Sequence, residues 1–288
     1  MNANFYPESV SGETTDAWSR HCSTPRNNRA SGPEERPMAG HRSIHESPAA
    51  CAHPACVWRP TAGIWLALAL VVFLCGPIQA QLTELQIKPD QTDPAIEMVH
   101  GPDVAVHGPE TASNHRLFLF IGGTGSNPLH SLRLDRIIAG WGYHAVSVDY
   151  ENNLITVALA HSHDPASFGQ YRDAITTGAP VSNRIKVSRS NSILNRFQKL
   201  LVYLVKHDPN GGWGEFMNRG QPAWNRIIVA GHSQGSGHAA YIGKMFRVER
   251  VLIFSGPQDY LDDLQEPAPW LGSKSATPPS RFFAFLSK

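Results

Sequence analysis

The chain has 288 residues, of which 41% are hydrophobic and 17% charged, and its formal net charge is +1. This composition is typical of a globular protein rather than of a disordered or membrane protein. The near-neutral charge gives no basic surface for nucleic acid. We therefore expect a small-molecule partner and no nucleic-acid partner, while the composition does not indicate an oligomeric state.

Two segments precede the expected globular domain. Residues 1–56 are rich in Ser, Pro, Arg, His and Glu and have no long apolar run, so we expect them to be disordered. Residues 57–80 place Arg59 before an uncharged apolar block from Ala62 to Gly76, which is the order of a signal peptide. The block is shorter than the roughly 20 apolar residues of a membrane span. We therefore expect export to the periplasm or medium, with membrane contact only through this signal or anchor. A start at Met38, or at the codon read here as Val57, stays an alternative.

All four cysteines precede the expected globular domain, residues 81–288. That domain therefore has no thiol and needs no disulfide. Cys51, His53 and Cys56 have a spacing that could hold zinc, but no second ligand pair follows them at zinc-finger spacing. We therefore expect no metal site, and nothing in the sequence indicates a cofactor.

Apolar runs and amphipathic stretches alternate from His115 onward. Continuous apolar runs, typical of strands buried on both faces, occur in RLFLFIGG, YHAVSVDY, RIIVA, RVLIFSG and RFFAF. A helical period predicts one helix over residues 192–207, ended by Pro209, and a shorter one over residues 128–140. This alternation predicts an α/β fold, with a mostly parallel sheet and helices on both faces.

Residues 151–187 interrupt the alternation. They show no clear periodicity and carry His161, His163 and Asp164. We expect a loop or a cap-like insertion, and insertions of this kind often shape binding sites.

The sequence GHSQG, residues 231–235, follows the run RIIVA and precedes a stretch of small residues. The pattern G-x-S-x-G between a strand and a helix is typical of a nucleophile elbow, a sharp turn that presents a serine hydroxyl. It predicts Ser233 as a nucleophile and needs Gly231 and Gly235, because a Cβ there would collide with the neighbouring strand and helix. The amide of Gln234, at the helix start, is expected to stabilise an oxyanion. The alternative is a tight turn whose serine only caps the helix.

A second glycine cluster, FIGGTGSNP at residues 120–128, ends an earlier strand. We expect the backbone N–H of Thr124 or Gly123 to be the other oxyanion donor. The alternative is a dinucleotide-binding loop, because Asp149 ends the next strand. However, the third glycine of that fingerprint is replaced by Pro128, and the chain has no P-loop sequence.

The stretches GGTGS, VSVDYEN and GHSQGSGHAAY give the chain, from about Arg116 onward, a resemblance to the α/β-hydrolase superfamily, in particular to bacterial serine hydrolases of the esterase and lipase type. The resemblance implies an α/β-hydrolase fold, a Ser233 nucleophile, and an acid and a histidine later in the chain. It also implies cleavage of a carboxylic ester or related acyl bond. An acyltransferase stays open as an alternative, as does a noncatalytic binding protein or pseudoenzyme with the same fold.

The triad partners that the resemblance implies are hard to find after the serine. The superfamily order is serine, acid, histidine, and the candidate acid is Asp259, which follows the run RVLIFSG. His238 follows Ser233 by five residues, or about 7 Å along the helix, so we expect it to pack rather than to act as the base. Three upstream histidines are alternatives for the base: His130, His161 and His163. We therefore expect an incomplete hydrolase domain whose C-terminal part is missing.

Overall fold

The computed structural model describes residues 81–110 and 113–286. The expected disordered segment 1–56, the expected signal segment 57–80 and the cysteine cluster within them lie outside the described residues. Within the described ranges, no helix is both long enough and apolar enough to cross a bilayer.

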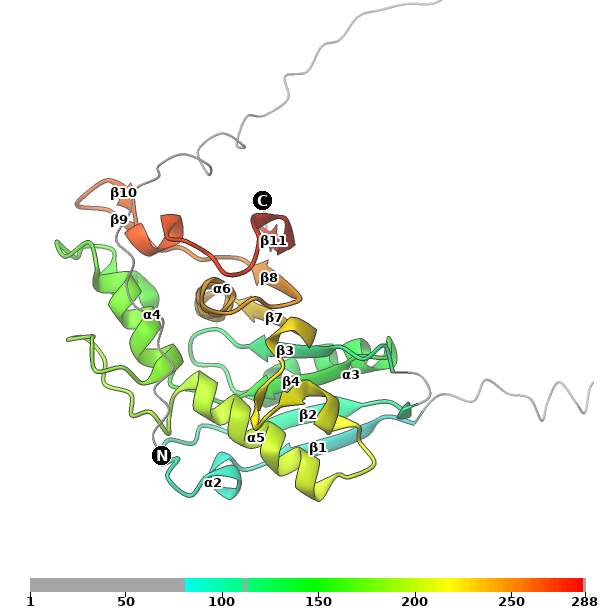
Figure 1. The fold of residues 1–288 in the computed structure, drawn as a ribbon. Helices are drawn as coiled ribbons and strands as arrows, with labels where there is room; N and C mark the ends of the chain where they lie inside the picture. The colour runs from blue at the N-terminus through cyan, green and yellow to red at the C-terminus, as the bar shows by residue number, and fades with distance from the viewer. Residues whose placement is uncertain (1–80, 111–112, 287–288) are drawn as a thin grey trace, which may run out of the picture. The chain divides into compact units, whose positions relative to one another are not determined.

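A seven-stranded sheet forms the centre of the domain, with β1 and β11 at its two edges (Figure 1). Its spatial order is β1, β2, β4, β3, β7, β8, β11. The strands are β1 (Thr83–Ile87), β2 (Asp103–His107), β4 (His144–Val148), β3 (Leu117–Ile121), β7 (Ile227–His232), β8 (Arg250–Phe254) and β11 (Phe282–Phe285). From β4 to β11 every neighbouring pair is parallel, which confirms the predicted mostly parallel sheet. β2 pairs antiparallel with both β1 and β4, and these first two strands were not predicted.

Two short hairpins lie outside the main sheet. β5 pairs antiparallel with β6, and β9 pairs antiparallel with β10. Their bounds are Met217–Asn218, Gln221–Pro222, Tyr260–Leu261 and Glu266–Pro267.

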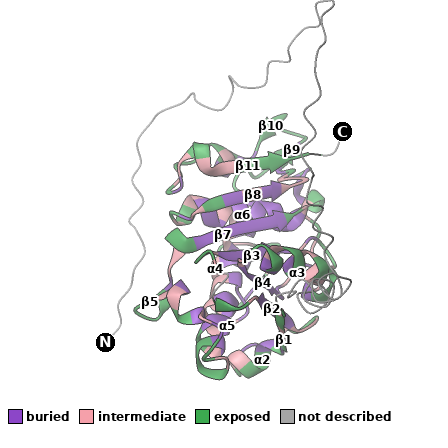
Figure 2. Cartoon of the chain, turned by 90° about the vertical axis from the view of Figure 1, so that its right-hand side faces the viewer, coloured by how far each residue is buried: buried purple, intermediate pink, exposed green. Residues whose placement is uncertain are grey.

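Helices cover both faces of the sheet. They are α2 (Pro89–Thr92), α3 (Leu132–Gly140), α4 (Ser167–Thr177), α5 (Ile193–His207) and α6 (Gln234–Met245). Because side chains alternate across a strand, Leu117 and Leu119 of β3 enter the large core with α4, α5 and α6. Phe118 and Phe120 face the opposite side, where α3 packs. The buried strands form the purple centre of Figure 2.

The predicted helix over residues 192–207 is α5. Ser192 caps it, because its side chain accepts a hydrogen bond from the Asn195 N–H at 3.3 Å. Most of its expected apolar stripe is buried, whereas Val205 stays 41% exposed. The periodicity therefore predicted both the helix and the face that it buries.

The segment 151–187 differs from the expected irregular insertion, because it contains α4. This helix buries the polar side chains of Arg172 and Thr176 alongside Phe168 and Tyr171. Its apolar and polar residues therefore do not separate into two faces, and the period was not visible in the sequence.

The strand β11 pairs with β8 on one side, and Phe283 and Phe285 are 42% and 54% exposed.

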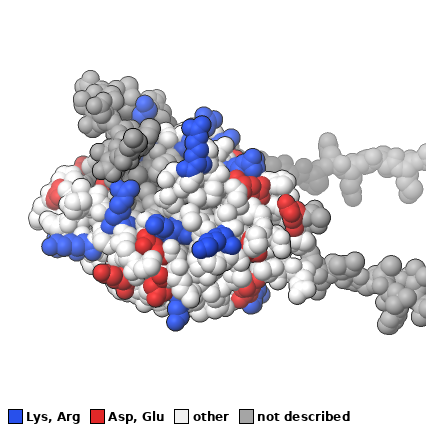
Figure 3. All heavy atoms as spheres, turned by 60° about the horizontal axis from the view of Figure 1, so that its bottom comes forward, with Lys and Arg blue, Asp and Glu red and all other residues white. Residues whose placement is uncertain are grey.

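Acidic and basic side chains are interspersed on the face that Figure 3 shows, which agrees with the near-zero net charge.

Candidate active site

Ser233 lies at the turn between β7 and α6, at the carboxyl edge of the parallel strands. Its backbone has φ 52° and ψ −120°, a conformation that residues other than glycine rarely adopt. The backbone N–H of Ser233 donates to the carbonyl of Phe254 in β8 at 2.8 Å. The Ser233 side chain makes no hydrogen bond to another described residue. The turn therefore holds the serine half-exposed in a strained conformation.

The two glycines that flank the serine lie against backbone. A Cβ on Gly231 would come within 2.2 Å of the Gly235 carbonyl oxygen. A Cβ on Gly235 would come within 2.1 Å of the Ile121 carbonyl oxygen. Both contacts are far below van der Waals distance, so a larger residue at either position would push β7, α6 and β3 apart.

The glycine loop that follows β3 faces this turn. Ile121 is paired with Gly231 across the β3–β7 ladder, so the residues that follow each strand emerge side by side. A Cβ on Gly123 would stand 3.3 Å from the Ser233 Cβ. The two loops that the sequence singled out are therefore in contact.

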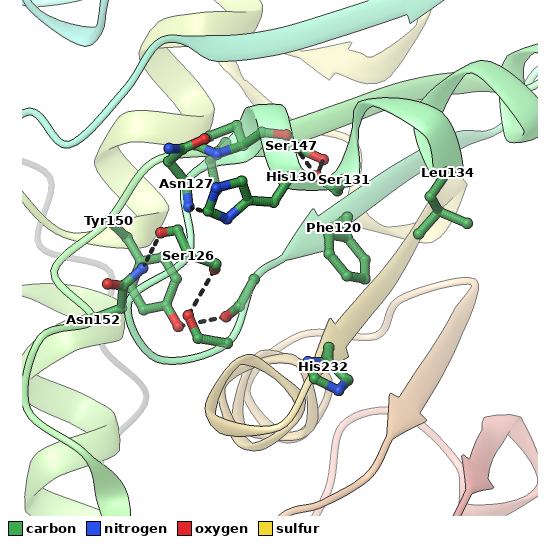
Figure 4. A pocket seen from close by; sticks show the side chains of 14 residues that line it. Phe120, Ser126, Asn127, His130, Ser131, Leu134, Ser147, Tyr150, Asn152 and His232 are labelled. Atoms are coloured by element: carbon green, nitrogen blue, oxygen red, sulfur yellow. Dashed lines mark hydrogen bonds between the residues drawn. The ribbon is translucent and has the colours of Figure 1, made fainter.

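Hydrogen bonds from β4 and its following loop fix the glycine loop (Figure 4). Tyr150 donates its hydroxyl to the Gly122 carbonyl at 2.7 Å, and Asn152 donates to the Ser126 carbonyl at 2.8 Å. Burial raises the pKa of Tyr150 well above its ordinary value, so its phenol stays protonated and able to donate.

The backbone N–H groups of Thr124 and Gln234 have no acceptor among the described residues. The Thr124 hydroxyl donates to the Gln234 side-chain oxygen at 2.6 Å and joins the two loops. Such amides can stabilise negative charge on an oxygen that sits between them.

A cavity of about 150 Å³ opens beside the serine. Its lining includes Ser233, Gln234, Thr124 and Arg172, together with Ile155 and Val157 from the segment before α4. This cavity is smaller than the ~300–1,000 Å³ that is usual for ligand sites.

A second cavity, of about 240 Å³, lies on the α3 side of the glycine loop (Figure 4). Phe120, His130, Leu134 and His232 are among the residues that line it. His130 accepts a hydrogen bond from the Asn127 N–H at 3.4 Å and makes none with Ser233.

The expected triad acid, Asp259, has partners other than a histidine. Its carboxylate accepts two hydrogen bonds from Arg172, at 2.6 and 3.0 Å, and one from the Trp270 indole at 2.9 Å. Both members of the Asp259–Arg172 pair are buried. The structure therefore places Asp259 against α4, and a role in orienting a catalytic histidine does not fit these partners.

The candidate histidines are also placed away from the serine hydroxyl. His161 and His163 are exposed and lie beside Asp263. His238 is fully buried, packs edge-on against Tyr150 and at a tilt against Tyr171, and lies 3.3 Å from the Thr176 hydroxyl. Burial, together with the nearby Arg172, lowers its pKa well below the ordinary value, so it is a neutral packing residue as expected.

Arg172 is the residue of this site that sequence reasoning missed. It lies in a segment without visible periodicity, and buried arginines are uncommon. A signal was present in the longer sequence GHSQGSG, because Gly237 has a steric reason to lack a Cβ. A Cβ there would lie 2.3 Å from the Arg172 guanidinium carbon.

No site for a metal is found in the part of the chain that the structure describes: it contains no cluster of three or more His, Cys, Asp or Glu side chains that could hold one. Next to Ser233, the buried Nε2 of Gln234 has no hydrogen-bond partner among the described residues.

No family model matches the sequence, and no curated protein matches it. Solved structures with a similar fold include an inhibited esterase B from Lactobacillus rhamnosis, at 12% identity and a TM-score of 0.33, with 64% of this chain and 48% of that chain covered. EstE1, a thermophilic carboxylesterase from a metagenomic library, has 16% identity and a TM-score of 0.31, with coverage of 66% and 52%. Esterase Est22 has 15% identity and a TM-score of 0.33, with coverage of 68% and 54%. The chain thus spans about half the length of these structures.

The mostly parallel sheet and the helices on both faces agree with the fold that the sequence resemblance implied, whereas the antiparallel strands β1 and β2 were not expected. The domain therefore has an α/β fold, with a mostly parallel sheet and helices on both faces.

Proposed function

We propose that the domain is a serine hydrolase that cleaves a carboxylic ester or a related acyl bond, with Ser233 of the GHSQG turn as nucleophile. The observation that carries this proposal is the strained conformation of Ser233, at φ 52°, between two glycines that permit no Cβ. A turn that only caps a helix does not need this strain, because a cap residue ordinarily has an extended backbone. Strain of this kind is concentrated at functional sites.

In the proposed reaction, the Ser233 oxygen attacks the acyl carbon and the carbonyl oxygen becomes negatively charged. The amides of Gln234 and of Thr124 or Gly123 stabilise that oxygen. The alcohol leaves with a proton, and water then releases the acid and restores the serine. The small cavity beside Ser233, of about 150 Å³, favours a short acyl group. The reaction needs no metal or organic cofactor.

The serine also needs a proton acceptor, and the described residues place no histidine on its hydroxyl. A serine without a base is a weak nucleophile. We therefore expect slow turnover, with the oxyanion donors supplying most of the rate.

A fluorophosphonate probe tests the nucleophile directly. Labelling of the folded protein should be lost in Ser233→Ala and retained in Ser182→Ala, a matched change in a loop away from the site. If the folded wild-type protein is not labelled even after long incubation, the noncatalytic binding protein becomes the favoured function. Release of a chromogenic alcohol from p-nitrophenyl acetate, with and without an added alcohol acceptor, separates hydrolysis from acyl transfer.

We also propose that the protein is exported, on the basis of the apolar block that follows Arg59. Expression of the full chain, followed by fractionation and N-terminal sequencing of the product, tests this. A product that starts near Gln81 outside the cytoplasm supports export, and an uncleaved cytoplasmic chain contradicts it.

A further inference from the structure

Arg172 is buried beside the serine turn and bonds directly to its backbone. Only 1% of its side chain is exposed, and its Nη1 donates to the Gln234 carbonyl oxygen at 2.7 Å. Gln234 is the first residue of α6, and its N–H belongs to the peptide unit just before the one that Arg172 holds. The guanidinium therefore restrains the residue that carries the proposed oxyanion donor.

Asp259 fixes the orientation of the Arg172 guanidinium, a fork of N–H donors. Its two oxygens accept from Nε and Nη2, at 3.0 and 2.6 Å, which leaves Nη1 directed at Gln234. Trp270 donates to the same carboxylate at 2.9 Å and holds it in place. A planar guanidinium can make these three bonds at once, whereas a lysine ammonium on its flexible stem cannot reproduce the arrangement.

The backbone of α6 is shaped to receive the fork. Gly237 leaves the space that a Cβ would take from the guanidinium. Ser236 adds a second restraint on the same turn, because its hydroxyl donates to the Ser233 carbonyl at 2.5 Å. The first turn of α6 is thus restrained by side-chain donors on two successive carbonyls.

We propose that Arg172, aligned by Asp259, is a positioning residue that fixes the first turn of α6 so that the Gln234 N–H stays directed at the substrate oxygen. This inference rests on the proposed serine hydrolase function. A contribution to folding alone would not require an ion pair, since apolar side chains of similar volume can replace buried pairs with little loss of stability.

The test removes the pair as a unit in Arg172→Met/Asp259→Asn, because a single change would leave a buried charge without its partner. The asparagine oxygen can still accept from Trp270. With p-nitrophenyl acetate, we expect kcat to fall at least tenfold while KM is unchanged, because oxyanion donors act mainly in the transition state. Phosphonate labelling should slow by a similar factor.

Arg196→Met/Asp149→Asn is the matched control. Arg196 and Asp149 form another fully buried pair, with a 3.3 Å contact, between α5 and the end of β4. This variant should fold and leave kcat unchanged, because the pair does not contact the first turn of α6. If the folded Arg172/Asp259 variant keeps its kcat within twofold, or if the control loses as much kcat, the inference is overturned.

Two single changes decide the question if the double variant does not fold. Arg172→Lys keeps the charge but not the fork, and Gly237→Ala displaces the fork while keeping both charges. Each should lower kcat at unchanged KM, and normal kcat in both would overturn the inference.

Hydrogen exchange separates this inference from the proposed function. If the wild-type protein shows neither labelling nor turnover, the proposed function fails. Positioning is then judged from the exchange of amides in residues 231–238. Faster exchange in the Arg172/Asp259 variant than in the Arg196/Asp149 variant supports it, and equal exchange overturns it.

Discussion

The backbone of Gly123 lies against Ser233, so closely that a Cβ on the glycine would stand 3.3 Å from the serine Cβ and 3.3 Å from the His232 ring nitrogen. In the proposed function, an acyl oxygen meets amides of the glycine loop and of the serine turn at this contact. Substitutions in this contact therefore test the proposed oxyanion site.

Gly123→Val should reduce phosphonate labelling of Ser233 at least tenfold, because the branched side chain pushes the glycine loop away from the serine. Loss of one oxyanion donor typically lowers the rate by about 10²–10³. Stability should change little, since the loop lies at the edge of the sheet. Gly140→Ala is the control, because a Cβ there meets nothing within 4 Å. Equal labelling of the two variants would contradict the assigned role of the loop.

Gly235→Ala should lower the stability of the folded domain and not only the rate of the proposed reaction. Its Cβ would lie 2.1 Å from the Ile121 carbonyl oxygen and 2.3 Å from that of Gly122, and backbone cannot rotate away as a side chain can. We expect a loss of about 3 kcal/mol in the free energy of unfolding, from the forced separation of β3 and α6.

Urea denaturation of Gly235→Ala beside Gly214→Ala measures this effect. A Cβ on Gly214 has open space, so the control should unfold close to the wild-type midpoint. An unchanged midpoint for Gly235→Ala would mean that α6 packs on β3 less closely than the structure has it.

The sequence predicted the parts of this site that depend on local pattern. Ser233, its two flanking glycines and the glycine loop at 120–128 follow from a motif and from apolar runs that end at one edge of a sheet. Their contact follows from the parallel pairing of β3 with β7.

The parts that were missed depend on contacts between distant segments. Asp259 follows a strand, as a triad acid can. Its partner, however, is Arg172 in α4, which lies 87 residues earlier in the chain. Helix α4 itself has polar residues on its buried side, so no hydrophobic period indicated it. The strands β1 and β2 have the sequences TELQI and DVAVH, which are not continuous apolar runs, and their pairing depends on tertiary packing rather than on local pattern.

His238→Phe should leave phosphonate labelling and its pH profile unchanged, because the histidine is buried against aromatic rings and does not contact Ser233. It should also change how the stability of the domain depends on pH below about 6.5. Burial lowers the pKa of His238 in the folded state, so the wild-type protein loses stability as the pH falls below the unfolded-state value of about 6.5. Thermal melts from pH 7 to pH 5 should show a smaller decrease in the variant. Lost labelling in a folded variant would instead assign the histidine to the reaction.

Asp103→Asn should change how the stability of the domain falls as the pH rises toward 8. Asp103 is fully buried in β2 and accepts a hydrogen bond from the Asp149 N–H at 2.7 Å, and burial raises its pKa to about 8. Between the unfolded-state pKa near 4 and this folded-state value, the folded protein holds a proton that the unfolded chain releases. Stability is therefore fully present below about pH 4 and is lost at about 1.4 kcal/mol per pH unit as the pH rises toward 8. An asparagine keeps the acceptor oxygen without a titrating proton, so urea midpoints of the variant should vary less between pH 5 and pH 8. The urea midpoints of Asp90→Asn, a change on the exposed surface of α2, should depend on pH as those of the wild-type protein do. If the midpoints of Asp103→Asn also depend on pH as in the wild-type protein, Asp103 is ionised in the folded domain.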